Sequence, residues 1–226
     1  MRRLLAASLL LLSPVAPAQN PALMPAIGAI RLGDYVQAID TLKPLAEKGD
    51  TEAQYVLGVA YETAPAAQRD LAAALAWYRR AAADGHPGAM NNLGTMYYDG
   101  RGVARDYEEA ARQYKAAADK GHPEALYNLA LMNGMGVGMQ RNEGEMVRLL
   151  RLSADAGVAA AQAQLGLAYE KGMGVTRDLD AAHRWLLLAA KAGHKGAMRE
   201  LATLYEMGLG VPSDDAQAKY WREHAK

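Results

Sequence analysis

Glycine recurs in this chain at a fixed interval of 36 residues, and this period limits the possible folds more strongly than any other feature. Counted from that glycine, the fifth residue of every interval is alanine, the ninth is leucine and the tenth is small. A period of this length is typical of stacked repeats, in which each unit buries its apolar face against its neighbours. The repeated glycines are Gly49, Gly85, Gly121, Gly157 and Gly193, and the ninth-position leucines are Leu57, Leu93, Leu129, Leu165 and Leu201.

A second glycine-rich stretch, present in four of the five intervals, predicts how a unit is built, and the first interval has APAAQ in its place. In KGMGVTRD, which ends at Asp178, the glycines can adopt the left-handed conformation that ends a helix, and the closing aspartate suits the N-cap of the next helix. Phosphate-binding loops with similar glycines follow a strand, and no strand-like alternation precedes this one. Each unit is therefore predicted to be helix A, a glycine loop and helix B. The sibling loops end at Asp106, Asn142 and Asp214, each followed three residues later by a capping-box residue (Glu109, Glu145, Gln217).

Three histidines share one repeat position, just before helix A: His86, His122 and His194. Proline follows two of them, at the first helical position, where a missing amide hydrogen costs nothing. Histidines one repeat apart are too far from each other to bind one zinc ion at about 2.1 Å per ligand. We therefore predict that these histidines begin helices and bind no metal.

The shared pattern A-x-x-x-L-G-x-x-Y-x-x-G-x-G-V-x-x-D resembles the Sel1-like repeat, a relative of the tetratricopeptide repeat. The resemblance covers five units over residues 49–226, and the preceding residues 19–48 are expected to hold a leader and a partial repeat. It implies an all-α fold, a right-handed α-solenoid of stacked helix-turn-helix repeats. The last unit is shortened and carries Arg222 where the previous unit has Leu186, which suits a polar capping repeat.

Residues 1–18 have the composition of a secretory signal peptide. Arg2 and Arg3 precede the short apolar run LLAASLLLL, and Ala16-Pro17-Ala18 is a small-x-small cleavage site. We expect the mature protein to be periplasmic or secreted, with no integral membrane segment after cleavage.

Chemistry-bearing patterns are sparse elsewhere in the chain. The absence of cysteine excludes disulfides and thiol catalysis, and no G-x-S-x-G, H-E-x-x-H or S-x-x-K motif occurs. The formal net charge of zero gives no reason to expect nucleic acid binding. We therefore predict a non-enzyme without a cofactor. Two alternatives are an envelope hydrolase or β-lactam-binding protein, and a Cu(I)-binding protein using Met132, Met135, Met139 and Met146.

The expected function is an exported adaptor that acts as a monomer and holds a protein or peptide of the cell envelope. Positions 4, 7, 11 and 14 of each repeat fall opposite the alanine and leucine columns of helix A. In tetratricopeptide-like arrays this side of helix A lines the concave surface, which the resemblance implies here too. Tyrosine is an efficient anchor at such surfaces because it has a large area and few rotamers. The predicted contact residues are Tyr55, Asn91, Tyr98, Tyr127, Leu131, Glu170, Arg199 and Glu206, and the same positions also include Glu52, Glu62 and Thr95.

Overall fold

The computed structural model describes residues 21–226, and the predicted signal peptide lies outside them. Over these residues every regular element is helical, with no strand. None of the helices is long and apolar enough to cross a bilayer. The residues form two compact units, which divide between Arg105 and Asp106 and are described separately.

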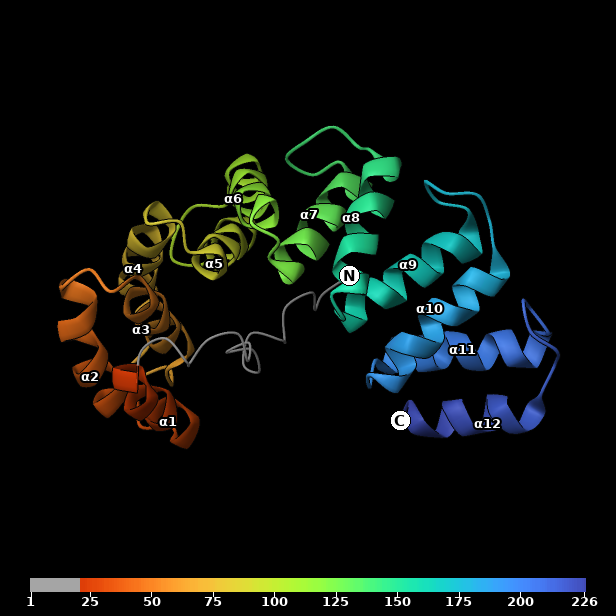
Figure 1. The fold of residues 1–226 in the computed structure, drawn as a ribbon, viewed down its shortest axis with the longest axis horizontal. Helices are drawn as coiled ribbons and strands as arrows, with labels where there is room; N and C mark the ends of the chain where they lie inside the picture. The colour runs from red at the N-terminus through yellow and green to blue at the C-terminus, as the bar shows by residue number, and fades with distance from the viewer. Residues whose placement is uncertain (1–20) are drawn as a thin grey trace. The chain divides into compact units, whose positions relative to one another are not determined.

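The first unit is a series of helices in which each packs against the next along the chain (Figure 1, red to yellow-green). A short 3-10 helix precedes α1, and α1 with α2 forms a helix pair ahead of the five predicted repeats. The partial repeat thus contributes a short helix A as well as helix B. The elements are η1 (Pro21–Leu23), α1 (Met24–Leu32), α2 (Tyr35–Glu47), α3 (Thr51–Thr63), α4 (Leu71–Ala83) and α5 (Pro87–Asp99).

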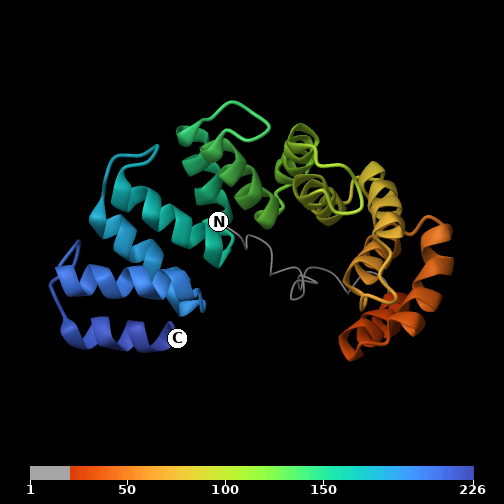
Figure 2. The ribbon, with the colours of Figure 1, turned by 180° about the vertical axis from the view of Figure 1, so that it is seen from behind.

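The second unit continues the alternation of helices A and B (Figure 2, green to blue). Repeats 1 to 5 are named here for the pairs α3/α4, α5/α6, α7/α8, α9/α10 and α11/α12. The elements of this unit are α6 (Tyr107–Asp119), α7 (Pro123–Met135), α8 (Glu143–Asp155), α9 (Ala159–Lys171), α10 (Leu179–Lys191), α11 (Lys195–Met207) and α12 (Asp215–His224).

The structure accounts for the 36-residue period. In repeat 4, helices α9 and α10 have thirteen residues each. A loop of seven residues separates them, and a turn of three residues leads to α11. The predicted α-solenoid class of stacked helix pairs is confirmed.

The alanine and leucine columns form the core, as predicted. Leu57, Leu165 and Leu201 are each 0% exposed. The small residue at the tenth position allows helix B to approach helix A closely, because a Cβ on Gly58 would lie 2.6 Å from the ring of Tyr78 and one on Gly166 would lie 2.7 Å from Leu186. A larger residue in this column would push the two helices of a repeat apart.

In repeats 2 to 5 the loop contains two glycines, and these have different roles. Gly172 ends α9 in the left-handed conformation, with φ at 69°, and a Cβ there would meet nothing closer than 3.4 Å. Gly174 has φ at 67°, and its Cβ would lie 2.5 Å from the carbonyl carbon of Glu143, the first residue of helix B in the preceding repeat. The second glycine therefore allows the loop of one repeat to rest on the backbone of the repeat before it.

Polar residues at the loop ends satisfy the helix termini. Asp178 accepts a hydrogen bond from the Ala181 amide at 2.9 Å, and its equivalents cap α4, α6, α8 and α12 in the same way. The predicted capping boxes are incomplete: Glu109 accepts its hydrogen bonds from Arg112 and Gln113, further along the helix. The backbone amides of Asn142 and Asp214 donate to carbonyls of helix A.

Candidate functional site

The histidines before helix A act as N-caps. Nδ1 of His86 accepts the Ala89 amide hydrogen at 3.1 Å, and Nδ1 of His194 accepts that of Ala197 at 3.0 Å. An accepting Nδ1 carries no hydrogen, so Nε2 is the donor nitrogen of the ring. Histidine is an unusual cap, and its identity as a helix-start residue was predictable only from its place in the repeat.

In the first unit, Tyr55 packs on one of these histidines. Its ring stacks on the His86 imidazole with centroids 4.3 Å apart, and it lies 6.1 Å from the ring of Tyr78. The His86 Nε2 donates to Glu52 Oε2 at 3.0 Å. Tyr55 is half-buried, so it presents one part of its surface to solvent from a fixed position.

The other two residues predicted in this unit lie on α5. Asn91 donates from Nδ2 to Asn92 Oδ1 at 3.3 Å, and Tyr98 is half-buried near the end of the helix. All three residues are thus partly accessible side chains on helices A of adjacent repeats.

Glu62 and Thr95 were expected on this surface, and that expectation is wrong, because their exposed fractions are 7% and 6%. The Glu62 carboxylate accepts the Tyr78 hydroxyl at 2.7 Å and pairs with Arg101 at 2.8 Å. Asn92 donates to the same hydroxyl at 3.1 Å. Burial, and then the negative charge of Glu62, raise the pKa of Tyr78 well above its ordinary value, which keeps the phenol a neutral donor.

In the second unit, Tyr127 and Leu131 lie on α7 one turn apart and are both half-buried. Burial raises the pKa of Tyr127. Glu170, near the end of α9, is also half-buried, and its Oε2 atom is buried without a hydrogen-bond partner among the described residues. Arg199 on α11 is exposed.

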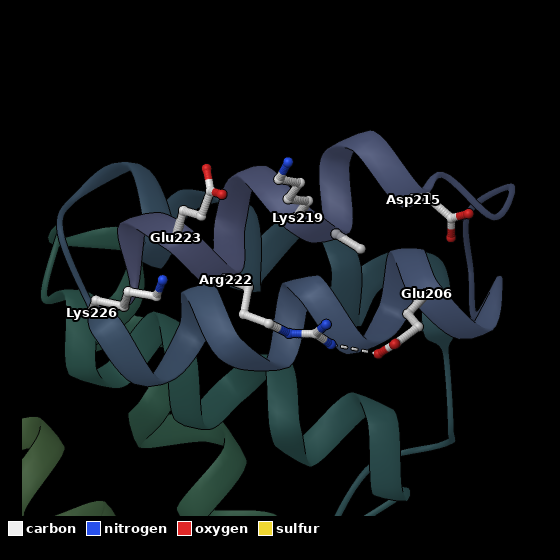
Figure 3. Close-up of a pocket in the computed structure, with 7 residues that line it drawn as sticks. Glu206, Asp215, Lys219, Arg222, Glu223 and Lys226 are labelled. Carbon is white, nitrogen blue, oxygen red and sulfur yellow. Dashed lines mark hydrogen bonds and ion pairs between the residues drawn. The ribbon is translucent and has the colours of Figure 1, made fainter.

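Glu206 at the end of α11 is exposed and pairs with Arg222 of α12 at 2.6 Å (Figure 3). The two residues border a hollow of about 370 Å³ on the surface of these helices. Small-molecule sites are mostly apolar with a few polar groups, whereas charged side chains make up most of this wall. The lining residues are Glu206, Asp215, Ala218, Lys219, Arg222, Glu223 and Lys226.

The methionines considered for copper binding have different surroundings. Met132 is buried in the core, and the sulfur of Met146 packs where a Cβ on Gly134 would lie. Met135 is 48% exposed. Two of the four therefore fill space in repeat 3, in keeping with methionine as a gap filler. Over residues 21–226, no group of three histidines or carboxylates is placed to hold a metal ion.

The fold and the placement of these side chains define an α-solenoid of tetratricopeptide-like helix pairs, with partly exposed side chains along its A helices. The chain belongs to the Sel1 repeat family, which matches residues 51–86, 87–122, 123–158, 159–194 and 196–221. Sel1 repeat proteins generally mediate protein–protein interactions and are typically non-enzymatic scaffolds.

Solved structures with the same fold include a Sel1 repeat protein from Oxalobacter formigenes. It is 29% identical, with 91% of this chain and 82% of that chain aligned and a TM-score of 0.82. A protective antigen of uropathogenic Escherichia coli with an SLR fold is 38% identical over 83% of this chain, with a TM-score of 0.78, and this chain covers 40% of that protein. The immunity protein Pa5087 from Pseudomonas aeruginosa, 18% identical over 93% of this chain and 83% of that chain, is similar in fold alone, with a TM-score of 0.61. No curated protein matches this chain.

Proposed function

We propose that this protein is an exported, non-enzymatic adaptor that binds a protein or peptide of the cell envelope along its A helices. The observation that carries the proposal is a run of Sel1 repeats whose A helices present Tyr55, Tyr98 and Tyr127 half-buried. Each of these rings offers apolar area and a hydroxyl while its backbone is fixed in a helix. Fixing these side chains on binding a partner would therefore cost little conformational entropy.

The proposed location outside the cytoplasm is supported by the sequence of residues 1–18, with its basic start, apolar run and small-residue cleavage site. The absence of cysteine is compatible with this location, because the repeats stack without needing disulfides. The related Escherichia coli protein is a protective antigen, which also favours a place accessible from outside the cell. Fractionation of the native host, with cleavage after Ala18 read by N-terminal sequencing, tests this part of the proposal.

Binding is tested by crosslinking the mature protein in envelope extracts and comparing the wild type with Tyr98→Ala and Tyr127→Ala. Tyr55→Phe is preferred to alanine at the third position, because the ring packs on His86. Tyr220→Ala is the matched control, since this tyrosine is 48% exposed and lies on helix B of repeat 5. We expect Tyr98→Ala and Tyr127→Ala to lose crosslinked partners that Tyr220→Ala retains. Equal capture by all variants would mean that these tyrosines do not contact the partner.

Labelled penicillin separates this proposal from the envelope hydrolase or β-lactam-binding alternative. We expect no covalent label on the purified mature protein, because the chain has no serine–lysine pair of the S-x-x-K type. A stoichiometric label that boiling in detergent does not remove would favour the alternative.

A further inference from the structure

Glu170 is a half-buried carboxylate with one unsatisfied oxygen. Its Oε2 atom is buried and accepts no hydrogen bond from the described residues. It belongs to the last turn of α9, which ends at Lys171, and the dipole of a helix is negative at this end. A cation at this end of the helix is attracted both by the helix dipole and by the carboxylate.

The same repeat position holds a glutamate in two other repeats, and both of these carboxylates pair with a guanidinium. Glu62 in repeat 1 pairs with Arg101 at 2.8 Å, and Glu206 in repeat 5 pairs with Arg222 at 2.6 Å. The two arginines come from different elements, the loop of the next repeat and helix B of the same repeat. The position therefore binds a guanidinium in each of these two repeats, by two different routes.

In repeat 4, leucine stands at both of the positions that supply these arginines. Leu186 stands at the helix B position that is Tyr78 in repeat 1 and Arg222 in repeat 5, and Leu209 stands at the loop position of Arg101. Leu186 is fully buried, and Leu209 packs at the edge of the same apolar cluster. Neither leucine can supply a charge or a hydrogen bond to Glu170.

The cationic groups closest in sequence do not compensate this carboxylate. Arg177 donates from Nε to the backbone carbonyl of Glu170 at 2.9 Å, so its bond satisfies the helix end and not the side chain. Lys171 is exposed. Among the described residues the Glu170 carboxylate has no ion pair within 4.0 Å, in contrast to Glu62 and Glu206.

We propose that Glu170 binds a lysine or arginine side chain of the protein partner, which would supply from outside the cation that arginines of this chain supply to Glu62 and Glu206. This inference rests on the proposed adaptor function and names the chemistry of one anchor. Half-buried Leu209 offers apolar surface of the kind that covers the methylene stem of such a side chain. The ion pair would be partly shielded from water, where charge-assisted hydrogen bonds are strongest.

The interaction is tested first with a small probe, N-acetyl-arginine amide, and its uncharged analogue N-acetyl-citrulline amide. Backbone amide resonances of α9 and α11 are followed during titration of the mature protein. We expect saturable shifts with the arginine probe and none with the citrulline probe. Glu170→Gln should weaken arginine binding by about tenfold or more, whereas Glu223→Gln, at an exposed position on α12, should leave it unchanged. Equal shifts from both probes, or an unchanged affinity in Glu170→Gln, would overturn the inference.

A second variant supplies the missing cation from within the chain. Leu209→Arg recreates the arrangement of Arg101 and Glu62. The new guanidinium should pair with the Glu170 carboxylate and reduce probe binding by about tenfold or more. Full binding by a folded Leu209→Arg protein, with folding verified by circular dichroism, would contradict the proposed geometry.

The envelope crosslinking experiment separates the two proposals. Partners that are lost with Tyr127→Ala but fully retained with Glu170→Gln would leave the adaptor function standing and refute the cation site. Selective binding of the arginine probe at Glu170, combined with no captured partner, would support the cation site and count against the adaptor function.

Discussion

The second loop glycine of repeats 2 to 5 allows a quantitative test of how the repeats stack. In repeat 4, Gly172 and Gly174 have nearly equal φ values of 69° and 67°. A Cβ at Gly172 would meet nothing closer than 3.4 Å, whereas at Gly174 it would lie 2.5 Å from the carbonyl carbon of Glu143. The two alanine variants therefore share the backbone cost and differ only in the steric one.

The magnitudes follow from these two terms. An L-residue in the left-handed region costs about 1–2 kcal/mol, and replacing glycine by alanine recovers about 0.4–1 kcal/mol through the unfolded chain. Gly172→Ala should therefore destabilise by about 1 kcal/mol. Gly174→Ala adds the cost of moving two backbone segments apart, about 1–3 kcal/mol as for other overpacked sites, for a total of about 3 kcal/mol.

Urea denaturation followed by far-ultraviolet circular dichroism measures the difference. With a slope of about 2 kcal/mol per molar urea, the midpoint of Gly174→Ala should lie about 1 M below that of Gly172→Ala. Gly144→Ala is the control variant that should not be destabilised. This exposed residue lies within α8 with a normal φ, and its Cβ would meet only Asn142 Oδ1 at 3.6 Å. Its midpoint should stay level or rise. Equal midpoints for the two loop variants would refute the idea that the second glycine is required by the preceding repeat.

Three further predictions concern the polar groups. Tyr78→Phe removes the donor to the buried Glu62 carboxylate and should lower the free energy of unfolding by about 1–3 kcal/mol; a urea midpoint within error of wild type would contradict this. Burial, followed by the charge of Arg199, lowers the pKa of His194 below its ordinary value, so its neutral form is favoured by folding. Wild type should then lose stability relative to His194→Asn as the pH falls below about 6.5, and a difference in thermal midpoint that stays constant from pH 7.5 to 5 would exclude the effect. Asp178→Ala should cost about 1 kcal/mol and Asp178→Asn much less, since only alanine loses the N-cap acceptor, and identical urea midpoints for the two would count against the cap.

The repeat period predicted most of the fold, because it depends on residues that act within one helix pair. The leucine column, the loop glycine that ends helix A and the aspartate that begins helix B all follow from local propensity and spacing. The second glycine is different, since its reason is the backbone of the preceding repeat. The sequence shows that this glycine recurs but does not show the backbone contact that requires it.

The candidate site was harder to predict for a related reason. Glu62 shares a repeat position with Glu170 and Glu206, yet its environment depends on Tyr78 from the facing helix and Arg101 from the next loop. Helical periodicity assigns a face to a residue but does not reveal what covers that face. Glu62 was therefore expected at the surface although it is buried, and its difference from Glu170 depends on side chains that other elements supply.

The stacked loops also restrict how a protein of this kind can change in length. The seven-residue loop of one pair rests on the first residue of helix B in the pair before it, and only three residues connect one pair to the next. Neither connection can therefore accommodate an additional residue. One inserted residue would move a glycine away from the carbonyl that requires it and place a side chain there instead. Whole 36-residue blocks can be gained or lost without this conflict, so we expect natural relatives to differ in length by complete repeats.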